Sequence, residues 1–129
     1  MKPHRILVAD DDPHFRDLIE YLLREAGFDA RGVRDGASAL TFIANQQVDL
    51  LLLDGSMPDI DGFEVLRLLR ANPQTRTLPV VMLTALRRAS DVQDAVNAGV
   101  TAYVTKPVSP RDLIARIKAN LRDDRVVFV

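Results

Sequence analysis

Short apolar runs alternate with helical patterns along this chain. The four clearest runs are 6–9, 48–53, 80–83 and 102–104. Short aliphatic runs without polar alternation are typical of strands that are buried on both faces, as in a parallel sheet. A weaker fifth run, 28–33, alternates in polarity and is less hydrophobic. That pattern indicates a strand nearer the edge of the same sheet.

Between these runs, apolar residues recur with the spacing of amphipathic helices. The five helical stripes lie within 15–26, 40–44, 63–69, 92–98 and 113–121. The last helix has the clearest start, with Ser109 as N-cap, Pro110 at the first helical position and Asp112 three residues after the cap. Five strands that alternate with five helices predict parallel βαβ units, and therefore an α/β fold with an open, doubly wound, five-stranded parallel sheet.

The composition is that of one ordinary globular domain: 129 residues, 47% hydrophobic and 27% charged. The 17 basic and 18 acidic residues give a net charge of −1, so no basic surplus favours binding to nucleic acid or membranes. The absence of cysteine excludes disulfides and cysteine zinc sites and fits a reducing compartment. The apolar stretch after Arg5 is too short for a signal peptide, and no stretch approaches a membrane span. We therefore expect a soluble, cytoplasmic protein.

Reactive polar side chains follow the predicted strands. Asp10 and Asp11 follow the first run, and Asp54, Thr84 and Lys106 stand after three later ones. In open α/β sheets, ligands bind outside the carboxyl ends of the strands. One edge of the sheet is therefore expected to carry three carboxylates, a hydroxyl and an ammonium group.

Three carboxylates in one group need a counter-charge. Two unit charges about 4 Å apart repel by roughly 4 kcal/mol at an effective dielectric constant near 20, and Lys106 alone leaves the group net negative. A hard divalent cation with oxygen ligands, Mg²⁺, is the natural occupant. Beside such a cation a carboxylate can accept a phosphoryl group, because aspartyl phosphates are known covalent intermediates. The metal, ammonium and hydroxyl would then surround the oxygens of the transferred group.

Five segments of the chain resemble the receiver domain of two-component response regulators. They are ILVADDDP at 6–13, DLLLLD at 49–54, MP with DGF at 57–63, VMLTA at 81–85 and YVTKP at 103–107. Five segments in this order and at these spacings are highly specific, and the resemblance covers about residues 4–122. It implies a flavodoxin-like strand order of 2-1-3-4-5. It also implies a receiver domain over 1–122, followed at 123–129 by a tail or the start of a linker.

The resemblance implies a phosphoacceptor with a metal beside it. Asp54 would accept a phosphoryl group from the phosphohistidine of a sensor histidine kinase or phosphotransfer protein, or from a small phosphodonor. Asp11 would bind Mg²⁺ directly and Asp10 mainly through water. Asp54 itself and the backbone carbonyl of Ser56 would complete the protein ligands. The domain would assist its own phosphorylation and dephosphorylation without being an enzyme acting on other substrates.

The resemblance also implies a switch. Lys106 would pair with Asp54 and then with the phosphoryl oxygens, and Thr84 would hydrogen-bond the phosphoryl group. Tyr103 would turn inward when Thr84 moves, which would reshape the surface of the fourth helix, fifth strand and fifth helix. The Lys106–Pro107 bond is expected to be cis. Asp12, in contrast, is expected to cap the first helix.

Partners follow from the resemblance only in outline. A kinase or phosphotransfer protein would supply the phosphoryl group, and an output domain or target protein would respond. A phosphorylation-dependent homodimer is compatible with this family, whereas direct contact with nucleic acid or membrane is not expected of this domain. The alternative is a receiver-like interaction module that works without phosphorylation.

Two other functional classes fit the residues poorly. A phosphatase of the haloacid dehalogenase type would place a second aspartate two residues after the nucleophile, where Ser56 stands. A dinucleotide-binding domain would place a glycine-rich turn after the first strand, where Asp10 and Asp11 stand.

Overall fold

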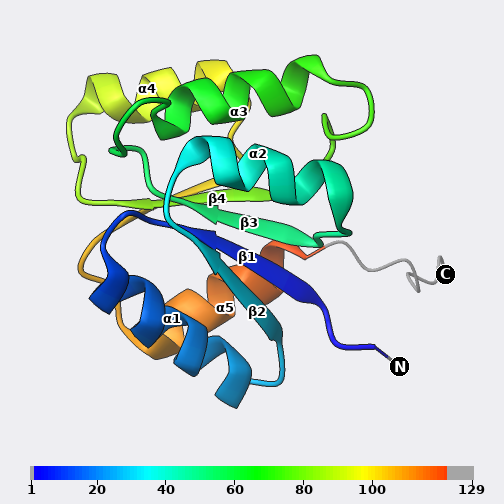
Figure 1. Cartoon of the computed structure of the whole chain (residues 1–129). Helices are drawn as coiled ribbons and strands as arrows, with labels where there is room; N and C mark the ends of the chain where they lie inside the picture. Colours follow the sequence, from blue (N-terminus) through cyan, green and yellow to red (C-terminus); the bar gives the residue numbers. More distant parts are fainter. Residues whose placement is uncertain (1, 122–129) are drawn as a thin grey trace, which may run out of the picture.

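The protein is described by a computed structural model that covers residues 2–121, with strands and helices in strict alternation (Figure 1). The strands are β1 (Arg5–Ala9), β2 (Asp29–Val33), β3 (Leu50–Leu53), β4 (Val80–Thr84) and β5 (Ala102–Thr105). The helices are α1 (Pro13–Glu25), α2 (Gly36–Asn45), α3 (Gly62–Ala71), α4 (Ala89–Ala98) and α5 (Pro110–Asn120). Each predicted element is therefore present in the predicted order.

The five strands form one parallel sheet in the order β2-β1-β3-β4-β5, which confirms the predicted fold and strand order. Helices α1 and α5 cover one face of the sheet, and α2, α3 and α4 cover the other (Figure 1). Because the first connection runs outward to β2 and the next returns past β1 to β3, the strand order reverses between β1 and β3. In open α/β sheets, ligands bind at such a reversal, outside the carboxyl ends of the strands.

The core lies on both faces of the central strands. All four residues of β3 and all five of β4 are buried, whereas β2 and β5 at the edges are only partly covered. This pattern confirms the prediction of doubly covered strands for the first, third and fourth strands, but not for the run 102–104, which forms the partly exposed edge strand β5. Complete burial of one such aliphatic side chain contributes about 1.5–3 kcal/mol, and the site lies at the ends of these buried strands.

The third strand is shorter than its apolar run predicted, because it begins at Leu50 and not at Val48. Asp49 explains the difference. Its carboxylate accepts a hydrogen bond of 2.6 Å from the backbone N–H of Arg5. In a regular strand pair, this N–H would donate to a backbone carbonyl of the neighbouring strand and not to a side chain. This end of the sheet is opposite the predicted site.

The helix ends follow the local chemistry of the sequence. The Asp12 carboxylate accepts from the backbone N–H groups of His14 and Phe15, which confirms its capping role at the start of α1. The Ser109 hydroxyl accepts from the N–H of Asp112 and caps α5. Gly99 ends α4 with a φ of 93°, a left-handed conformation that glycine adopts without strain.

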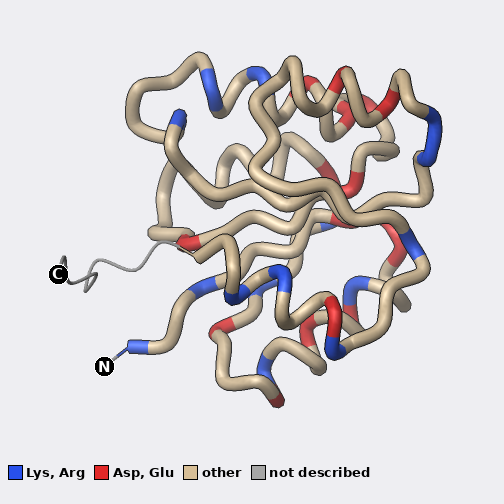
Figure 2. Tube along the Cα trace, turned by 180° about the vertical axis from the view of Figure 1, so that it is seen from behind, with Lys and Arg blue, Asp and Glu red and all other residues tan. Residues whose placement is uncertain are grey.

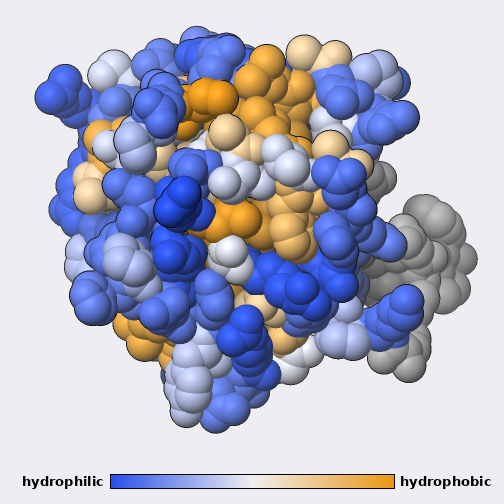
Figure 3. All heavy atoms as spheres, viewed as in Figure 1, coloured by the Kyte–Doolittle hydropathy of each residue, from blue (hydrophilic) through white to orange (hydrophobic). Residues whose placement is uncertain are grey.

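Basic and acidic residues are mixed along the described chain (Figure 2). Lysine and arginine are interspersed with aspartate and glutamate along the helices (Figure 2). The face seen in Figure 3 is mostly hydrophilic, with apolar atoms showing over α3 and α2. No helix within residues 2–121 is long and apolar enough to cross a membrane. The predicted tail at 123–129 lies outside the described residues.

Candidate functional site

The carboxyl ends of β1 and β3 bring three carboxylates together. Asp10 and Asp11 follow β1 and Asp54 follows β3, and one oxygen of each lies within 4.8 Å of the others. Asp10 and Asp54 are only 2% and 8% exposed, whereas Asp11 is open to solvent. The acidic group predicted from the strand ends is therefore formed, with two of its members buried.

Backbone groups fix both buried carboxylates. The N–H of Asp54 donates to the carbonyl of Ala9, which continues the β1–β3 pairing one residue beyond β3. Asp10 Oδ1 accepts from the N–H of Asp12 at 2.9 Å, and Asp54 Oδ1 accepts from the N–H of Ser56 at 3.1 Å. The chain that follows each aspartate thus holds one of its oxygens, while the other oxygen faces Lys106.

Lys106 connects the two buried carboxylates. Its Nζ lies 2.8 Å from Asp10 Oδ2 and 3.5 Å from Asp54 Oδ2. Burial alone would lower the pKa of Lys106, but the hydrogen bond to Asp10 and the charge of Asp54 outweigh burial and raise that pKa above its usual value. The ammonium therefore stays charged at neutral pH. The Lys106–Asp54 pairing expected from the resemblance is the longer of its two contacts.

Thr84 and Tyr103 both form hydrogen bonds with the backbone of Leu86. Thr84 is fully buried, and its hydroxyl accepts from the N–H of Leu86 at 3.3 Å. The Tyr103 hydroxyl donates to the carbonyl of Leu86 at 2.8 Å. Burial raises the pKa of the Tyr103 phenol, and the charges of Asp91 and Asp54 add to this effect. Both predicted switch residues therefore contact the loop after β4, and the inward turn of Tyr103 remains a prediction.

The start of α3 packs directly on the loop that follows Asp54. The N–H of Gly62 donates to the carbonyl of Gly55 at 3.1 Å. A Cβ atom at Gly62 would lie 2.2 Å from the carbonyl oxygen of Asp54, so only glycine allows this approach. The Lys106–Pro107 bond on the other side of the site is cis, as expected.

Three side chains outside the predicted set of site residues touch the site. The Phe15 ring centroid lies 4.0 Å from Lys106 Nζ. The Arg16 guanidinium donates to the backbone carbonyl of Asp10 at 2.8 Å, and the Arg87 guanidinium donates to the backbone carbonyl of Lys106 at 2.6 Å. Phe15 was predicted only as part of the apolar stripe of α1. Its position in the first helical turn after the aspartates could have indicated that it lies beside the site.

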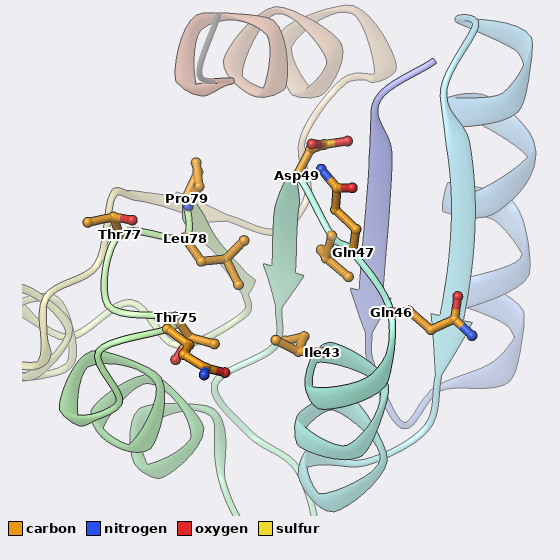
Figure 4. Close-up of a pocket in the computed structure, with 10 residues that line it drawn as sticks. Ile43, Gln46, Gln47, Asp49, Thr75, Thr77, Leu78 and Pro79 are labelled. Atoms are coloured by element: carbon orange, nitrogen blue, oxygen red, sulfur yellow. The ribbon is translucent and has the colours of Figure 1, made fainter. Parts of the chain in front are cut away.

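A separate pocket of about 440 Å³ lies at the opposite, amino end of β3 and β4. Residues before β3 and β4 line it, among them Ile43, Gln46, Thr75 and Leu78 (Figure 4). Its one carboxylate, that of Asp49, is engaged by the N–H of Arg5. We therefore place the candidate site at the group of carboxylates at the carboxyl ends of β1 and β3 and not in this pocket.

The three clustered carboxylates fit a hard divalent cation. Its carboxylate oxygens are ligands that Mg²⁺ prefers, and Asp11 leaves one side open to solvent for the water ligands that Mg²⁺ retains. One ammonium does not neutralise three carboxylates, so a bound cation would relieve a net negative charge.

The chain is similar to receiver domains over almost all of its described residues. A family model of the response regulator receiver domain matches residues 6–118. The chain is 42% identical over 118 residues to the DNA-binding response regulator MtrA of Mycolicibacterium smegmatis, which covers 92% of this chain and 50% of that protein. It is 39% identical over 123 residues to the DNA-binding dual master transcriptional regulator RpaA of Synechocystis, which covers 95% of this chain and 51% of that protein. The chain thus spans about half the length of these curated relatives.

Two solved structures share this fold. Chemotaxis protein CheY4 of Vibrio cholerae superposes with a TM-score of 0.88 at 27% identity, over 92% of this chain and 99% of that one. A putative response regulator from Chloroflexus aurantiacus superposes with a TM-score of 0.87 at 37% identity, over 92% of this chain and 97% of that one. With the family match and the shared strand order, these similarities lead to one conclusion. The chain belongs to the receiver domains of response regulators, which are signalling domains of two-component systems.

Proposed function

We propose that Asp54 is the phosphoacceptor of this receiver domain and that transfer to it depends on Mg²⁺. The observation that carries the proposal is the position of Asp54: a buried carboxylate, 3.5 Å from a lysine ammonium and grouped with two further carboxylates. A phosphoryl group on Asp54 would meet a cation on one side and metal ligands on the other. Phosphoryl transfer depends mostly on such positioning and charge stabilisation.

In the transfer step, an Asp54 carboxylate oxygen attacks phosphorus and forms a new P–O bond. The bond from phosphorus to the donor breaks, and its electron pair leaves with the histidine nitrogen of a kinase or with the acyl oxygen of acetyl phosphate. One Asp54 oxygen is already held by the Ser56 N–H, which restricts the carboxylate to one orientation. The Lys106 ammonium stabilises the negative charge on the phosphoryl oxygens, and Thr84 offers its hydroxyl to one of them.

The carboxylates of Asp10, Asp11 and Asp54 and the backbone carbonyl of Ser56 would hold the metal. Bound there, Mg²⁺ supplies positive charge that screens the phosphoryl oxygens from these carboxylates. Thr84 and Tyr103 would transmit phosphorylation to the surface, since both are hydrogen-bonded to the backbone of Leu86. A movement of Thr84 towards the phosphoryl group would then also alter the hydrogen bond of Tyr103. The affected surface would be that of α4, β5 and α5.

The donor proposed here is a sensor histidine kinase or a phosphotransfer protein. Because the chain spans about half of relatives named as DNA-binding response regulators, we propose that it controls an output domain or a separate target protein. A homodimer that forms on phosphorylation, and the cytoplasm as compartment, also stay predictions.

Intact-mass spectrometry tests the proposed transfer. The protein is incubated with acetyl phosphate and Mg²⁺, beside an EDTA control and an Asp54→Asn control. A mass gain of one phosphoryl group, absent from both controls, is the expected result. An equal gain in the Asp54→Asn protein would contradict the assignment. No gain, from acetyl phosphate or from a cognate kinase, would favour the interaction module that works without phosphorylation.

A further inference from the structure

The Lys106 ammonium has a third neighbour besides its two carboxylates. The ring of Phe15 lies under it, with 4.0 Å between Nζ and the ring centroid. An ammonium within about 6 Å of an aromatic face is attracted by the ring quadrupole, and this distance is well inside that limit. Since only 21% of the Lys106 side chain is exposed, the attraction is screened less than on an open surface.

The ring is held in place from two directions. Phe15 lies in the first turn of α1, where its N–H donates to the Asp12 cap at 3.3 Å. Its side chain is half-buried and packs against the core cluster between the sheet and helices α1 and α5. The ring is therefore a fixed support, positioned by the same turn that presents Asp10 and Asp11.

A ring differs from the other neighbours of Lys106 in one useful respect. The carboxylates of Asp10 and Asp54 accept hydrogen bonds from the ammonium, whereas the ring attracts its charge without an oxygen acceptor. The N–H donors of Lys106 thus remain available to oxygen atoms. An aliphatic residue of similar size would pack against the core equally well but would not attract the ammonium.

We propose that Phe15 is a positioning residue for phosphoryl transfer, because its ring holds the Lys106 ammonium at the end of β5 while leaving the N–H donors free for Asp54 and the incoming phosphoryl oxygens. This inference rests on the proposed function of Asp54. In the unphosphorylated protein Nζ is nearer Asp10 than Asp54, by 2.8 Å against 3.5 Å. The ring keeps the ammonium within reach of both carboxylates, so only a small displacement is needed when a phosphoryl group arrives.

The test separates the charge attraction of the ring from its packing. Phe15→Leu removes the aromatic ring, and 3,4,5-trifluorophenylalanine at position 15 keeps its shape but withdraws its electron density. Phe15→Trp retains an aromatic face. Phe28→Leu is the matched control, because Phe28 is half-buried against the same core cluster, whereas the cation–π contact of Lys106 within the described residues is with Phe15. The readout is the rate of phosphorylation by acetyl phosphate in excess Mg²⁺, with the melting temperature of each variant measured beside it.

The expected result is a phosphorylation rate about two- to thirtyfold lower for Phe15→Leu and for the trifluorinated ring, with Phe15→Trp and Phe28→Leu close to the wild type. An independent readout uses the unphosphorylated protein. The ring-current shift of the Lys106 ε-methylene protons should be present in the wild type and absent from Phe15→Leu.

Equal rates for the wild type, Phe15→Leu and the trifluorinated protein would overturn the inference and leave the assignment of Asp54 standing. A wild type that takes up no phosphoryl group would overturn both. A rate loss in Phe15→Leu that the trifluorinated ring does not share would also overturn it, because packing alone would then explain the loss.

Discussion

The acidic cluster should make the metal-free fold less stable than a variant that lacks one of its charges. The perturbation is Asp54→Asn, measured in chelator. Asn keeps the size of the side chain and an oxygen that can accept from the Ser56 N–H, so the main change is the loss of one negative charge. The size of the effect depends on the charge pairs that Asp54 makes with Asp10, Asp11 and Lys106.

Asp54 and Asp10 are both buried with oxygens no more than 4.8 Å apart, which costs at least about 3.5 kcal/mol at an effective dielectric constant of 20. Asp11 is exposed, and its repulsion of Asp54 is about 1 kcal/mol in a water-like dielectric. The attraction of Lys106 at 3.5 Å offsets these with about 4.7 kcal/mol. The charge terms therefore nearly cancel, and the cost of burying a carboxylate remains.

We expect Asp54→Asn to raise the free energy of unfolding by about 1–2 kcal/mol in EDTA, or the melting temperature by about 3–8 °C. Asp10→Asn should raise the free energy of unfolding by about 1 kcal/mol less than Asp54→Asn does. Asp10 lies only 2.8 Å from Lys106, so its substitution removes a stronger attraction. The assay is thermal unfolding in EDTA and again in excess Mg²⁺, where metal binding should stabilise the wild type most.

Asp94→Asn serves as the control, because Asp94 is exposed on α4 and outside the cluster. Its melting temperature should not move. A melting temperature of Asp54→Asn that is unchanged or lower in EDTA would refute the reasoning that the clustered, buried charge destabilises the metal-free fold.

Three further predictions concern the frame of the site and the amino edge of the sheet. Gly62→Ala should lower the free energy of unfolding by about 2–4 kcal/mol, because its Cβ would meet the Asp54 carbonyl; an unchanged urea midpoint would count against this close approach. Asp59 has a φ of 65°, so Asp59→Val should lower the melting temperature by the equivalent of about 1–2 kcal/mol while Asp59→Gly leaves it nearly unchanged. Arg5, then Arg31, hold the pKa of Asp29 below its usual 3.8, so the carboxylate stabilises the fold above that pH and loses this effect as pH falls through the lowered pKa. Urea unfolding of Asp29→Asn should therefore differ from the wild type at pH 7 and converge with it in strong acid; a constant difference would contradict the pairing.

Residues at strand ends were predictable because parallel strands share a direction. Asp10, Asp11 and Asp54 stand after the two strands that flank the point where the strand order reverses, and the structure brings all three together. Sequence spacing also located the caps Asp12 and Ser109, since a cap depends only on neighbours within one helical turn.

Contacts between loops were not predictable in the same way. The approach of Lys106 to Asp10 joins residues 96 positions apart and depends on the rotamer of a long side chain. The Phe15 ring was predicted correctly as part of an apolar stripe, but hydrophobic spacing does not report which cation a ring meets. Arg87 donates to the Lys106 carbonyl from the loop before α4. The spacing of apolar residues does not predict the path of such a loop.

Chemical identification of the modified residue shows whether Asp54 carries the phosphoryl group. Borohydride reduces an aspartyl phosphate to homoserine, so the protein is treated with acetyl phosphate and Mg²⁺, reduced, digested and mapped by mass spectrometry. We expect homoserine at position 54, and none when EDTA replaces Mg²⁺. Homoserine at another aspartate, or a phosphoryl group that survives reduction on a hydroxyl side chain, would contradict the assignment of Asp54.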